Sequence, residues 1–221
     1  MRVLIVDDEE DIRDLLEYNL KQEGYLVQTA ENGVIGIEKA KSFNPDLIVL
    51  DVMMPEMDGI ETCEQLRSQK QFERTTIWFL TARSEDYSQI AGLEAGADDY
   101  ISKPIKPKVF KSKVKSLLRR SSDTNFANVE ENKDFIIDRS KYLVVIDGND
   151  ILLPRKEFEL LSLLYSEVQR VFKREEILDE VWGKDIVVGD RTIDVHIRKL
   201  REKIGSEKIV TIKGVGYKLE L

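Results

Sequence analysis

Short runs rich in apolar residues alternate with helically spaced apolar residues along the first 120 residues of the chain. Five such runs predict strands, at residues 3–6, 25–30, 47–50, 76–80 and 99–101. Between the runs, apolar residues recur at helical spacing, as Ile12, Leu16 and Leu20 do before Gly24 ends the first pattern. Strands that alternate with helices form parallel sheets covered on both faces. This part is therefore predicted to be α/β, a flavodoxin-like doubly wound five-stranded parallel sheet.

The pattern changes in the second half of the chain. Residues 121–133 are polar and lack periodicity, which predicts a flexible linker between a domain at 1–120 and a domain at 134–221. The second domain contains predicted strands and helices in mixed order, with strands at 135–138, 142–147 and 151–153, helices at 157–166, 174–182 and 191–204, and a closing hairpin at 209–221. This combination is typical of an α+β winged helix-turn-helix domain.

Composition indicates the cellular compartment in which the protein is expected. The chain has 221 residues, 42% hydrophobic and 34% charged, which is ordinary for a globular protein. It contains no apolar run of the ~20 residues that span a bilayer. The first strand begins at once, leaving no room for a signal peptide, and the single cysteine, Cys63, fits a reducing compartment. We expect a cytoplasmic protein. The lone histidine, His196, excludes a multi-histidine metal site and a histidine phosphorelay in the first domain.

Polar residues follow the predicted strands of the first domain. Asp7 and Asp8 follow the first strand, Asp51 ends the third, Thr81 ends the fourth and Lys103 trails the fifth. Ligands bind at the carboxyl ends of the strands in open α/β sheets, so these side chains are expected to converge at one edge. A single aspartate at a strand end is more often just solvated. The convergence of five polar groups makes that interpretation poor.

Three carboxylates at one sheet edge require compensation. At ~4 Å they would repel by up to ~4 kcal/mol per pair at an effective dielectric near 20. Either raised pKa values or a divalent cation must offset this, and an all-oxygen site with few ligands suits Mg²⁺, which also recruits phosphate. Lys103 offers a positive charge and Thr81 a hydroxyl to a phosphoryl group, while a carboxylate could attack phosphorus.

The motifs of the first domain resemble those of a response-regulator receiver domain. They are Asp7-Asp8, LDVMMPEMDG at residues 50–59, LTA at 80–82 and YISKP at 100–104. The resemblance covers essentially all of residues 1–120 and implies that a sensor histidine kinase phosphorylates Asp51. It also implies that Mg²⁺ is held by Asp8, Asp51 and the backbone carbonyl of Met53.

The resemblance implies roles for the surrounding residues as well. Asp7 would hold the metal shell through water, and Thr81 would move to bind the phosphoryl group. Tyr100 would rotate inward behind Thr81 as a switch. The peptide bond between Lys103 and Pro104 would be cis, which a tertiary amide tolerates at a cost of only ~0.5–1 kcal/mol.

Two positions depart from the receivers of transcription factors, which usually dimerise through charged cross-pairs. Gln89 stands where Lys or Arg is usual, and Val109 stands where Glu is usual. Asp98 or Asp99 could form another pair with Lys113. Because exposed ion pairs contribute only ~0–1 kcal/mol each, dimerisation is expected to be weakened or re-specified rather than lost.

Charge in the second domain is concentrated near its end. Residues 121–221 carry 17 basic and 20 acidic residues, yet residues 191–218 alone carry eight basic and three acidic ones. A local excess of +5 in a chain of net charge −8 indicates a surface for a polyanion.

The helix predicted at 191–204 can be divided by angle. Its core stripe comprises Ile193, Ile197, Leu200 and Ile204. The opposite side carries Arg191, Thr192, Asp194, Val195, Arg198, Lys199 and Glu202. A solvated charged face is the ordinary explanation. An exposed Val195 among the charges favours DNA instead, with Val195 on a thymine methyl and Arg191, Asp194 or Arg198 on base edges.

The second domain resembles the DNA-binding domain of the OmpR/PhoB type. The resemblance covers about 134–221 and depends on VWG at 181–183, RTIDVHIRKLR at 191–201 and TIKGVGY at 211–217. Pro154 replaces the usual threonine before the first long helix and is expected in its first turn. Lys213 would border or enter the minor groove. Trp182 also fits a core position and His196 a surface one. The residues implied in phosphate contacts are Trp182, Arg191, Thr192, His196, Arg198, Arg201 and Thr211.

The sequence therefore predicts a DNA-binding transcriptional response regulator and not an enzyme. Phosphorylation of Asp51 would promote a homodimer on promoter DNA, and RNA polymerase is a further candidate partner. Two alternatives remain. A phosphohydrolase of the haloacid dehalogenase type would need a second acid where Met53 stands. A phosphorylation-independent regulator could retain the acids while binding DNA in the same way.

Overall fold

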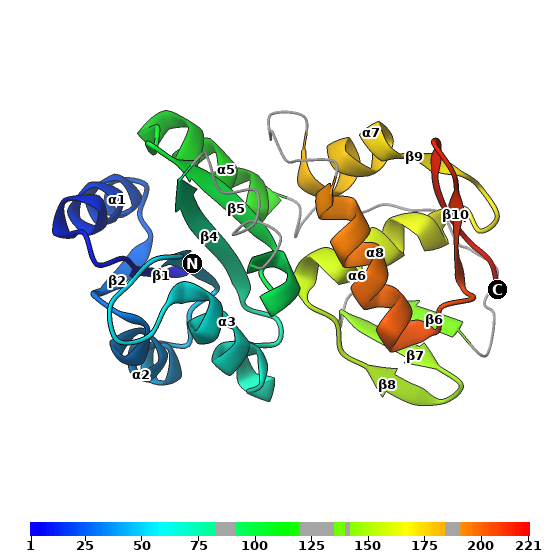
Figure 1. Ribbon diagram of the computed structural model, residues 1–221, viewed down its shortest axis with the longest axis horizontal. Helices are drawn as coiled ribbons and strands as arrows, with labels where there is room; N and C mark the ends of the chain where they lie inside the picture. Colours follow the sequence, from blue (N-terminus) through cyan, green and yellow to red (C-terminus); the bar gives the residue numbers. More distant parts are fainter. Residues whose placement is uncertain (83–91, 120–134, 140–141, 184–190) are drawn as a thin grey trace. The chain divides into compact units, whose positions relative to one another are not determined.

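The computed structural model describes residues 1–82, 92–119, 135–139, 142–183 and 191–221 (Figure 1). It divides into two compact units, Met1–Asp123 and Thr124–Leu221. The predicted linker at 121–133 and Gln89 lie outside the described residues. Within the described ranges, no helix is both long and apolar enough to cross a membrane.

The first unit is built on a parallel sheet, as the alternating pattern predicted. Its strands are β1 (Arg2–Val6), β2 (Leu26–Ala30), β3 (Leu47–Asp51), β4 (Thr76–Ala82) and β5 (Asp99–Lys103). They are ordered β2-β1-β3-β4-β5, and every neighbouring pair is parallel. Side chains in β3 are buried throughout, which explains why this strand is a continuous apolar run.

Helices cover both faces of this sheet (Figure 1). They are α1 (Glu10–Gln22), α2 (Gly33–Phe43), α3 (Gly59–Arg67), the short 3₁₀ helix η1 (Lys70–Phe72) and α5 (Pro107–Arg119). Alternate strand residues such as Val3 and Ile5 share a core with Leu16 of α1 and Phe110 of α5. On the other face, Gly36 of α2 lies against the side chain of Val6, as the period-two alternation of strands requires.

The second unit combines two antiparallel sheets with two long helices, a mixture that agrees with the predicted winged helix-turn-helix class. Its strands form the orders β6-β7-β8 and β10-β11-β9. Its elements in chain order are β6 (Phe135–Asp138), β7 (Leu143–Ile146), β8 (Asn149–Ile151), α6 (Arg155–Ser166), β9 (Phe172–Lys173), α7 (Arg174–Ile177), the π-helical turn η2 (Leu178–Trp182), α8 (Arg191–Ile204), β10 (Ile209–Ile212) and β11 (Gly216–Leu219).

Two local details differ from the sequence-based expectation. The turn between β7 and β8 is formed by Asp147 and Gly148, both with positive φ, one residue earlier than predicted. Positive φ at both central positions suits a two-residue hairpin, because it matches the twist of the strands. Pro154 occupies the cap position before α6 rather than the first turn.

Candidate functional site

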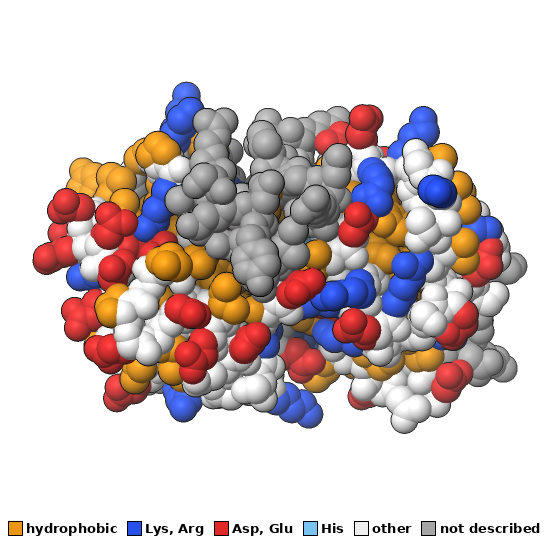
Figure 2. Space-filling view, in the orientation of Figure 1, with side chains coloured by type: hydrophobic (Ala, Val, Ile, Leu, Met, Phe, Trp, Pro, Cys, Tyr) orange, Lys and Arg blue, Asp and Glu red, His pale blue; other side chains and the backbone are white. Residues whose placement is uncertain are grey.

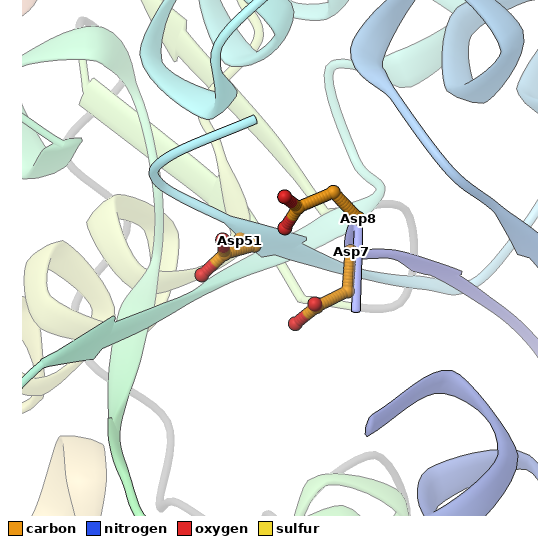
Figure 3. A group of neighbouring side chains, drawn as sticks. All are labelled: Asp7, Asp8 and Asp51. Carbon is orange, nitrogen blue, oxygen red and sulfur yellow. The ribbon is translucent and has the colours of Figure 1, made fainter. Parts of the chain in front are cut away.

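The register of the sheet places the candidate polar groups at one edge. Val6 pairs with Leu50, so Asp7 lies level with Asp51 one residue further along. Asp51 pairs with Leu80, and Thr81 follows directly. Figure 3 shows the side chains of Asp7, Asp8 and Asp51 gathered at the adjoining ends of β1 and β3.

The three aspartates form a compact group of oxygen donors. One carboxylate oxygen from each lies within 4.8 Å of the others. Asp7 and Asp51 are buried, at 0% and 6% exposure, whereas Asp8 is exposed. Asp7 Oδ1 accepts a hydrogen bond from the Glu9 backbone N–H at 2.9 Å, while its buried Oδ2 lies 3.1 Å from the Lys103 ammonium. Such a set of oxygen donors suits a hard divalent cation.

Lys103 provides positive charge at the same edge. Its ammonium lies 3.1 Å from Asp7 Oδ2, 3.1 Å from Asp51 Oδ1 and 2.9 Å from Glu9 Oε1. The Lys103–Pro104 peptide bond is cis, as the resemblance implied. This lysine therefore bridges the ends of β1, β3 and β5.

The environment raises the pKa of both buried acids, Asp7 and Asp51. Burial raises the pKa of Asp51 to about 6, the charge of Asp7 adds to this, and Lys103 opposes it. Burial likewise raises the pKa of Asp7 against the opposing hydrogen bond from Glu9 and the charge of Lys103. The single ammonium of Lys103 thus offsets the repulsion between the acids only in part. A bound cation would lower this repulsion further.

The backbone around Asp51 leaves little room for side chains. A Cβ on Gly59 would lie 2.0 Å from the Asp51 carbonyl oxygen, so glycine is required where α3 begins. The Gly59 N–H donates to the Val52 carbonyl at 3.0 Å, and Asp58 caps α3 through its carboxylate. Met53 lies in the intervening loop with its side chain 70% exposed. Loop and helix together hold Asp51 in place.

The predicted switch residues lie on the neighbouring strands. Thr81 is 2% exposed and pairs in register with Ser102 of β5. Tyr100 is 8% exposed, so its side chain is already buried in this structure. Thr81 follows Leu80, the register partner of Asp51, while Tyr100 of β5 pairs in register with Phe79 of β4.

Two residues near this edge were missed by sequence reasoning. Glu9 contacts Lys103, as described above. Arg13 of α1 donates from Nη1 to the carbonyl oxygens of Asp7 at 2.7 Å and of Asp8 at 2.9 Å, which fixes the loop that carries both acids. The continuation of the Asp7-Asp8 pair by a third acid was the available signal for Glu9. No spacing rule points to Arg13.

Three of the residues predicted for a dimer interface, Asp98, Asp99 and Lys113, form ion pairs within the chain. Asp98 is fully buried, lies 2.7 Å from Arg67 and accepts a hydrogen bond from the backbone N–H of Ile77 at 2.8 Å. Its pairing with Lys113 across a dimer stays a prediction. Asp99 pairs with Lys113 of its own chain at 2.9 Å. Val109 is 55% exposed.

The outward face of α8 is less open than its angles predicted. Val195 is 8% exposed, so the prediction of an exposed valine is wrong. Helical periodicity indicates which side of a helix faces the core, but not how far around the helix burial extends. Thr192 and His196 are each 2% exposed, because both flank the core stripe. The His196 ring packs against buried Trp182, with ring centroids 5.2 Å apart.

Several polar residues of α8 and the hairpin bind one another. Asp194 pairs with Arg174 at 2.5 Å and accepts a hydrogen bond from the Tyr217 hydroxyl. Arg201 donates to the Ile209 carbonyl at 2.6 Å and to Thr211 Oγ1 at 2.8 Å. Asp194 and Arg201 therefore join α8 to the elements that pack on it.

Exposed positive charge remains on this helix. Arg198 keeps 54% of its side chain exposed and lies 3.8 Å from Glu202, and Lys199 is partly exposed. Figure 2 shows Lys and Arg side chains gathered over the region of α8. The side chain of Arg191 is outside the described set, and Lys213 lies at the hairpin turn after β10.

Comparison with known proteins agrees with both halves of this geometry. The response regulator receiver domain family matches residues 3–115, and the family described as transcriptional regulatory protein, C terminal, matches residues 148–219. Transcriptional regulatory protein ResD of Bacillus subtilis is 42% identical, covering 100% of this chain and 96% of its own length. The alkaline phosphatase synthesis transcriptional regulatory protein PhoP of the same organism is 43% identical, covering 99% and 96%.

Solved structures give the same result. The response regulator DrrB of Thermotoga maritima, described as an OmpR/PhoB homologue, is 32% identical over 100% of this chain and 99% of its own, with a TM-score of 0.52. A mutant of RitR is 26% identical over 99% and 98%, with a TM-score of 0.76. The chain therefore belongs to the OmpR/PhoB family of two-component response regulators, with a receiver domain followed by a DNA-binding transcriptional regulatory domain.

Proposed function

We propose that Asp51 accepts a phosphoryl group from a sensor histidine kinase in a Mg²⁺-dependent reaction, and that the phosphorylated chain binds promoter DNA as a homodimer. The observation that carries this proposal is the meeting of Asp7, Asp8, Asp51 and Lys103 at one sheet edge. The chain acts as a regulator in the cytoplasm, where kinase and DNA are both accessible, and not as an enzyme. RNA polymerase is the partner expected at the promoter.

The transfer step follows from the chemistry of the site. A carboxylate oxygen of Asp51 attacks phosphorus, the P–N bond of the kinase phosphohistidine breaks, and its electron pair stays on the imidazole nitrogen. Lys103 and Thr81 then bind phosphoryl oxygens, while Tyr100 fills the space behind Thr81 as the switch. Mg²⁺ would be held by Asp8, Asp51 and the Met53 carbonyl, with Asp7 acting through water. It would supply charge neutralisation between carboxylates and phosphate.

The DNA-binding step uses α8 and the terminal hairpin. Arg198 and Lys199 are the proposed contacts of the helix, since both extend from its outward face. Lys213 is proposed to reach the minor groove. Asp194 and Arg201, engaged with Arg174 and the hairpin, are proposed to orient the helix. The remaining proposed phosphate contacts are Trp182, Arg191, Thr192, His196 and Thr211.

Exposure of the purified protein to acetyl phosphate with Mg²⁺ tests the first step. The intact mass should rise by one phosphoryl group, and Asp51→Asn should abolish the gain. No gain, or a gain that survives Asp51→Asn, would overturn the proposal. Repeated turnover of a small phosphate ester would favour the phosphohydrolase alternative.

The second step is tested by DNA binding before and after phosphorylation. Fragments selected from random DNA by the phosphorylated protein supply the probe. Phosphorylation should tighten binding, because two linked DNA modules raise the effective concentration of each other. Equal affinity of both forms would instead support the phosphorylation-independent regulator.

A further inference from the structure

Lys103 lies close to three carboxylates, and only two of them, those of Asp7 and Asp51, belong to the aspartate cluster of the proposed reaction. Its ammonium contacts Asp7, Asp51 and Glu9 at 3.1, 3.1 and 2.9 Å. A lysine ammonium has three N–H donors, so these three acceptors can satisfy it fully. A phosphoryl oxygen that binds Lys103 must therefore displace one of these carboxylates, or share with it one N–H of the ammonium.

Glu9 differs from the other two acceptors. The side chains of Asp7 and Asp51 are 0% and 8% exposed, whereas that of Glu9 is 60% exposed. Glu9 also lies outside the aspartate cluster that could hold a cation. Displacing an exposed carboxylate costs little, because water takes over its hydrogen bonds. Glu9 is thus the acceptor that Lys103 can exchange most easily.

The position of Glu9 is fixed by its backbone. Glu9 precedes α1 as its cap residue, but its side chain makes no capping hydrogen bond. Its N–H donates to Asp7 Oδ1 at 2.9 Å, and Arg13 holds the carbonyls of Asp7 and Asp8 on either side of that bond. The loop therefore presents the Glu9 carboxylate toward Lys103 instead of using it for the helix end.

We propose that Glu9 is a positioning residue that holds Lys103 in the unphosphorylated protein and competes with the phosphoryl group for it. This inference rests on the proposed function of Asp51. Phosphorylation replaces the single negative charge of the Asp51 carboxylate with a phosphoryl group that carries nearly two, and this group both attracts Lys103 and repels Glu9. Glu9 stabilises the unphosphorylated form and so slows loading of the site.

The size of the effect follows from the exposure of the pair. An exposed ion pair contributes ~0–1 kcal/mol, which corresponds to a change of up to about fivefold in a rate. Glu9→Gln keeps the shape of the side chain and removes its charge. Glu10→Gln makes the same change in net charge one residue away, and Glu10 forms no hydrogen bond or ion pair with Lys103 in the described structure.

The first experiment measures the initial rate of Asp51 phosphorylation by acetyl phosphate with Mg²⁺, from the intact mass of the full chain. The Asp51 oxygen forms the new bond to phosphorus, the P–O bond to the acetyl group breaks, and acetate leaves with its electron pair. Glu9→Gln should raise the rate about two- to fivefold, while Glu10→Gln leaves it unchanged. Equal rates for the two variants would overturn the inference.

A double-mutant cycle separates competition for Lys103 from a merely structural role. In a Lys103→Gln background, Glu9→Gln should no longer change the rate, because no ammonium remains to be released. The same gain in both backgrounds would refute the inference. Binding of trifluoroberyllate with Mg²⁺, a phosphoryl mimic, should tighten in Glu9→Gln by a similar factor, and unchanged affinity would count against it.

The two proposals fail in distinguishable ways. Absence of any phosphoryl gain at Asp51 in the wild-type protein overturns the proposed function itself. Normal phosphorylation of Asp51 in the wild-type protein, with Glu9→Gln and Glu10→Gln behaving alike, overturns only the role of Glu9.

Discussion

At the scale of single residues, Asp51 carries its charge where charge is unfavourable. Burial and Asp7 raise its pKa to about 6, against an ordinary value near 3.8 in the unfolded chain. The folded state therefore binds a proton more tightly than the unfolded state. Above pH 6 the ionised group destabilises the fold by up to about 3 kcal/mol, and below pH 4 this penalty vanishes.

Asp51→Asn should therefore stabilise the metal-free protein at pH 7.5 by about 1–3 kcal/mol, with the difference from wild type disappearing near pH 4. Urea denaturation of both proteins in the presence of a chelator measures this. Mg²⁺ should stabilise the wild-type protein more than the variant, because it binds the ionised acid. Asp14→Asn, an exposed change of the same net charge, serves as the control. An Asp51→Asn variant no more stable than Asp14→Asn would contradict the prediction.

Gly59→Ala tests the close packing under the same aspartate. Its Cβ would lie 2.0 Å from the Asp51 carbonyl oxygen, so the loop must shift. We expect a loss of about 2–4 kcal/mol in the free energy of unfolding and slower phosphorylation. Gly24→Ala is the comparison, because nothing lies within 4 Å of its added Cβ and only its positive φ of 81° opposes alanine. That variant should lose about 1 kcal/mol. A similar loss in both variants would contradict the steric argument.

At the scale of elements, one arginine connects α8 to the terminal hairpin. Arg201 donates from Nε and Nη2 to the Ile209 carbonyl and from Nη2 to Thr211 Oγ1. Lysine has no planar fork and cannot reproduce this set of bonds. Arg201→Lys should therefore lower the stability of the second unit by about 1–2 kcal/mol.

Arg198→Lys is the matched control for that prediction, since Arg198 is more exposed and lies 3.8 Å from Glu202 of its own helix. Its effect on unfolding should stay within about 0.5 kcal/mol. Thermal unfolding of each variant measures the difference in stability. Amide hydrogen exchange in β10 and β11 shows whether the loss lies in the second unit. Equal losses in the two variants would contradict the prediction that Arg201 stabilises the contact between α8 and the hairpin.

Much of the element structure could be predicted from the sequence. The continuous apolar run at β3 and the alternation of strands with helices indicate the parallel sheet, and the sheet in turn brings Asp7, Asp51 and Lys103 together. Periodicity also predicted the core stripe of α8, whose Ile193 and Leu200 are fully buried. These features are encoded locally, by spacing along one element.

The features that the sequence did not predict are contacts between elements. Asp98 was named only as a possible partner of Lys113 in a dimer, and sequence reasoning did not predict that Arg67 from α3 binds it inside the unit. Asp194 was assigned to base edges, yet Arg174 and Tyr217 bind it. Each partner lies on another element, 20 or more residues away in sequence, and residue type does not encode such pairings.

At the scale of the whole molecule, the chain must bring an anion-binding surface to DNA despite a net charge of −8. The basic residues between 191 and 218 provide local attraction. Lys199→Ala and Arg198→Ala should each weaken DNA binding and lower the dependence of log K on log salt by about 1, because each removes one phosphate contact. Fluorescence anisotropy at several salt concentrations measures both. Lys141→Ala, outside α8 and the hairpin, is the control; unchanged affinity of the α8 variants would contradict the interface.

In the proposed function, assembly of two chains is the remaining step between Asp51 and DNA, and we expect it to depend on the residues that depart from the family pattern. Val109 is 55% exposed and stands where an acid is usual, while Gln89 stands where a base is usual. The internal pairing of Asp99 with Lys113 leaves fewer charges for a partner chain. Gln89→Lys with Val109→Glu should therefore strengthen the phosphorylated dimer about two- to fivefold by sedimentation, through ~1 kcal/mol from restored cross-pairs. Each single change introduces a charge without its partner and should give no gain. A gain from Val109→Glu alone would show that loss of the exposed apolar side chain, rather than pairing, controls assembly.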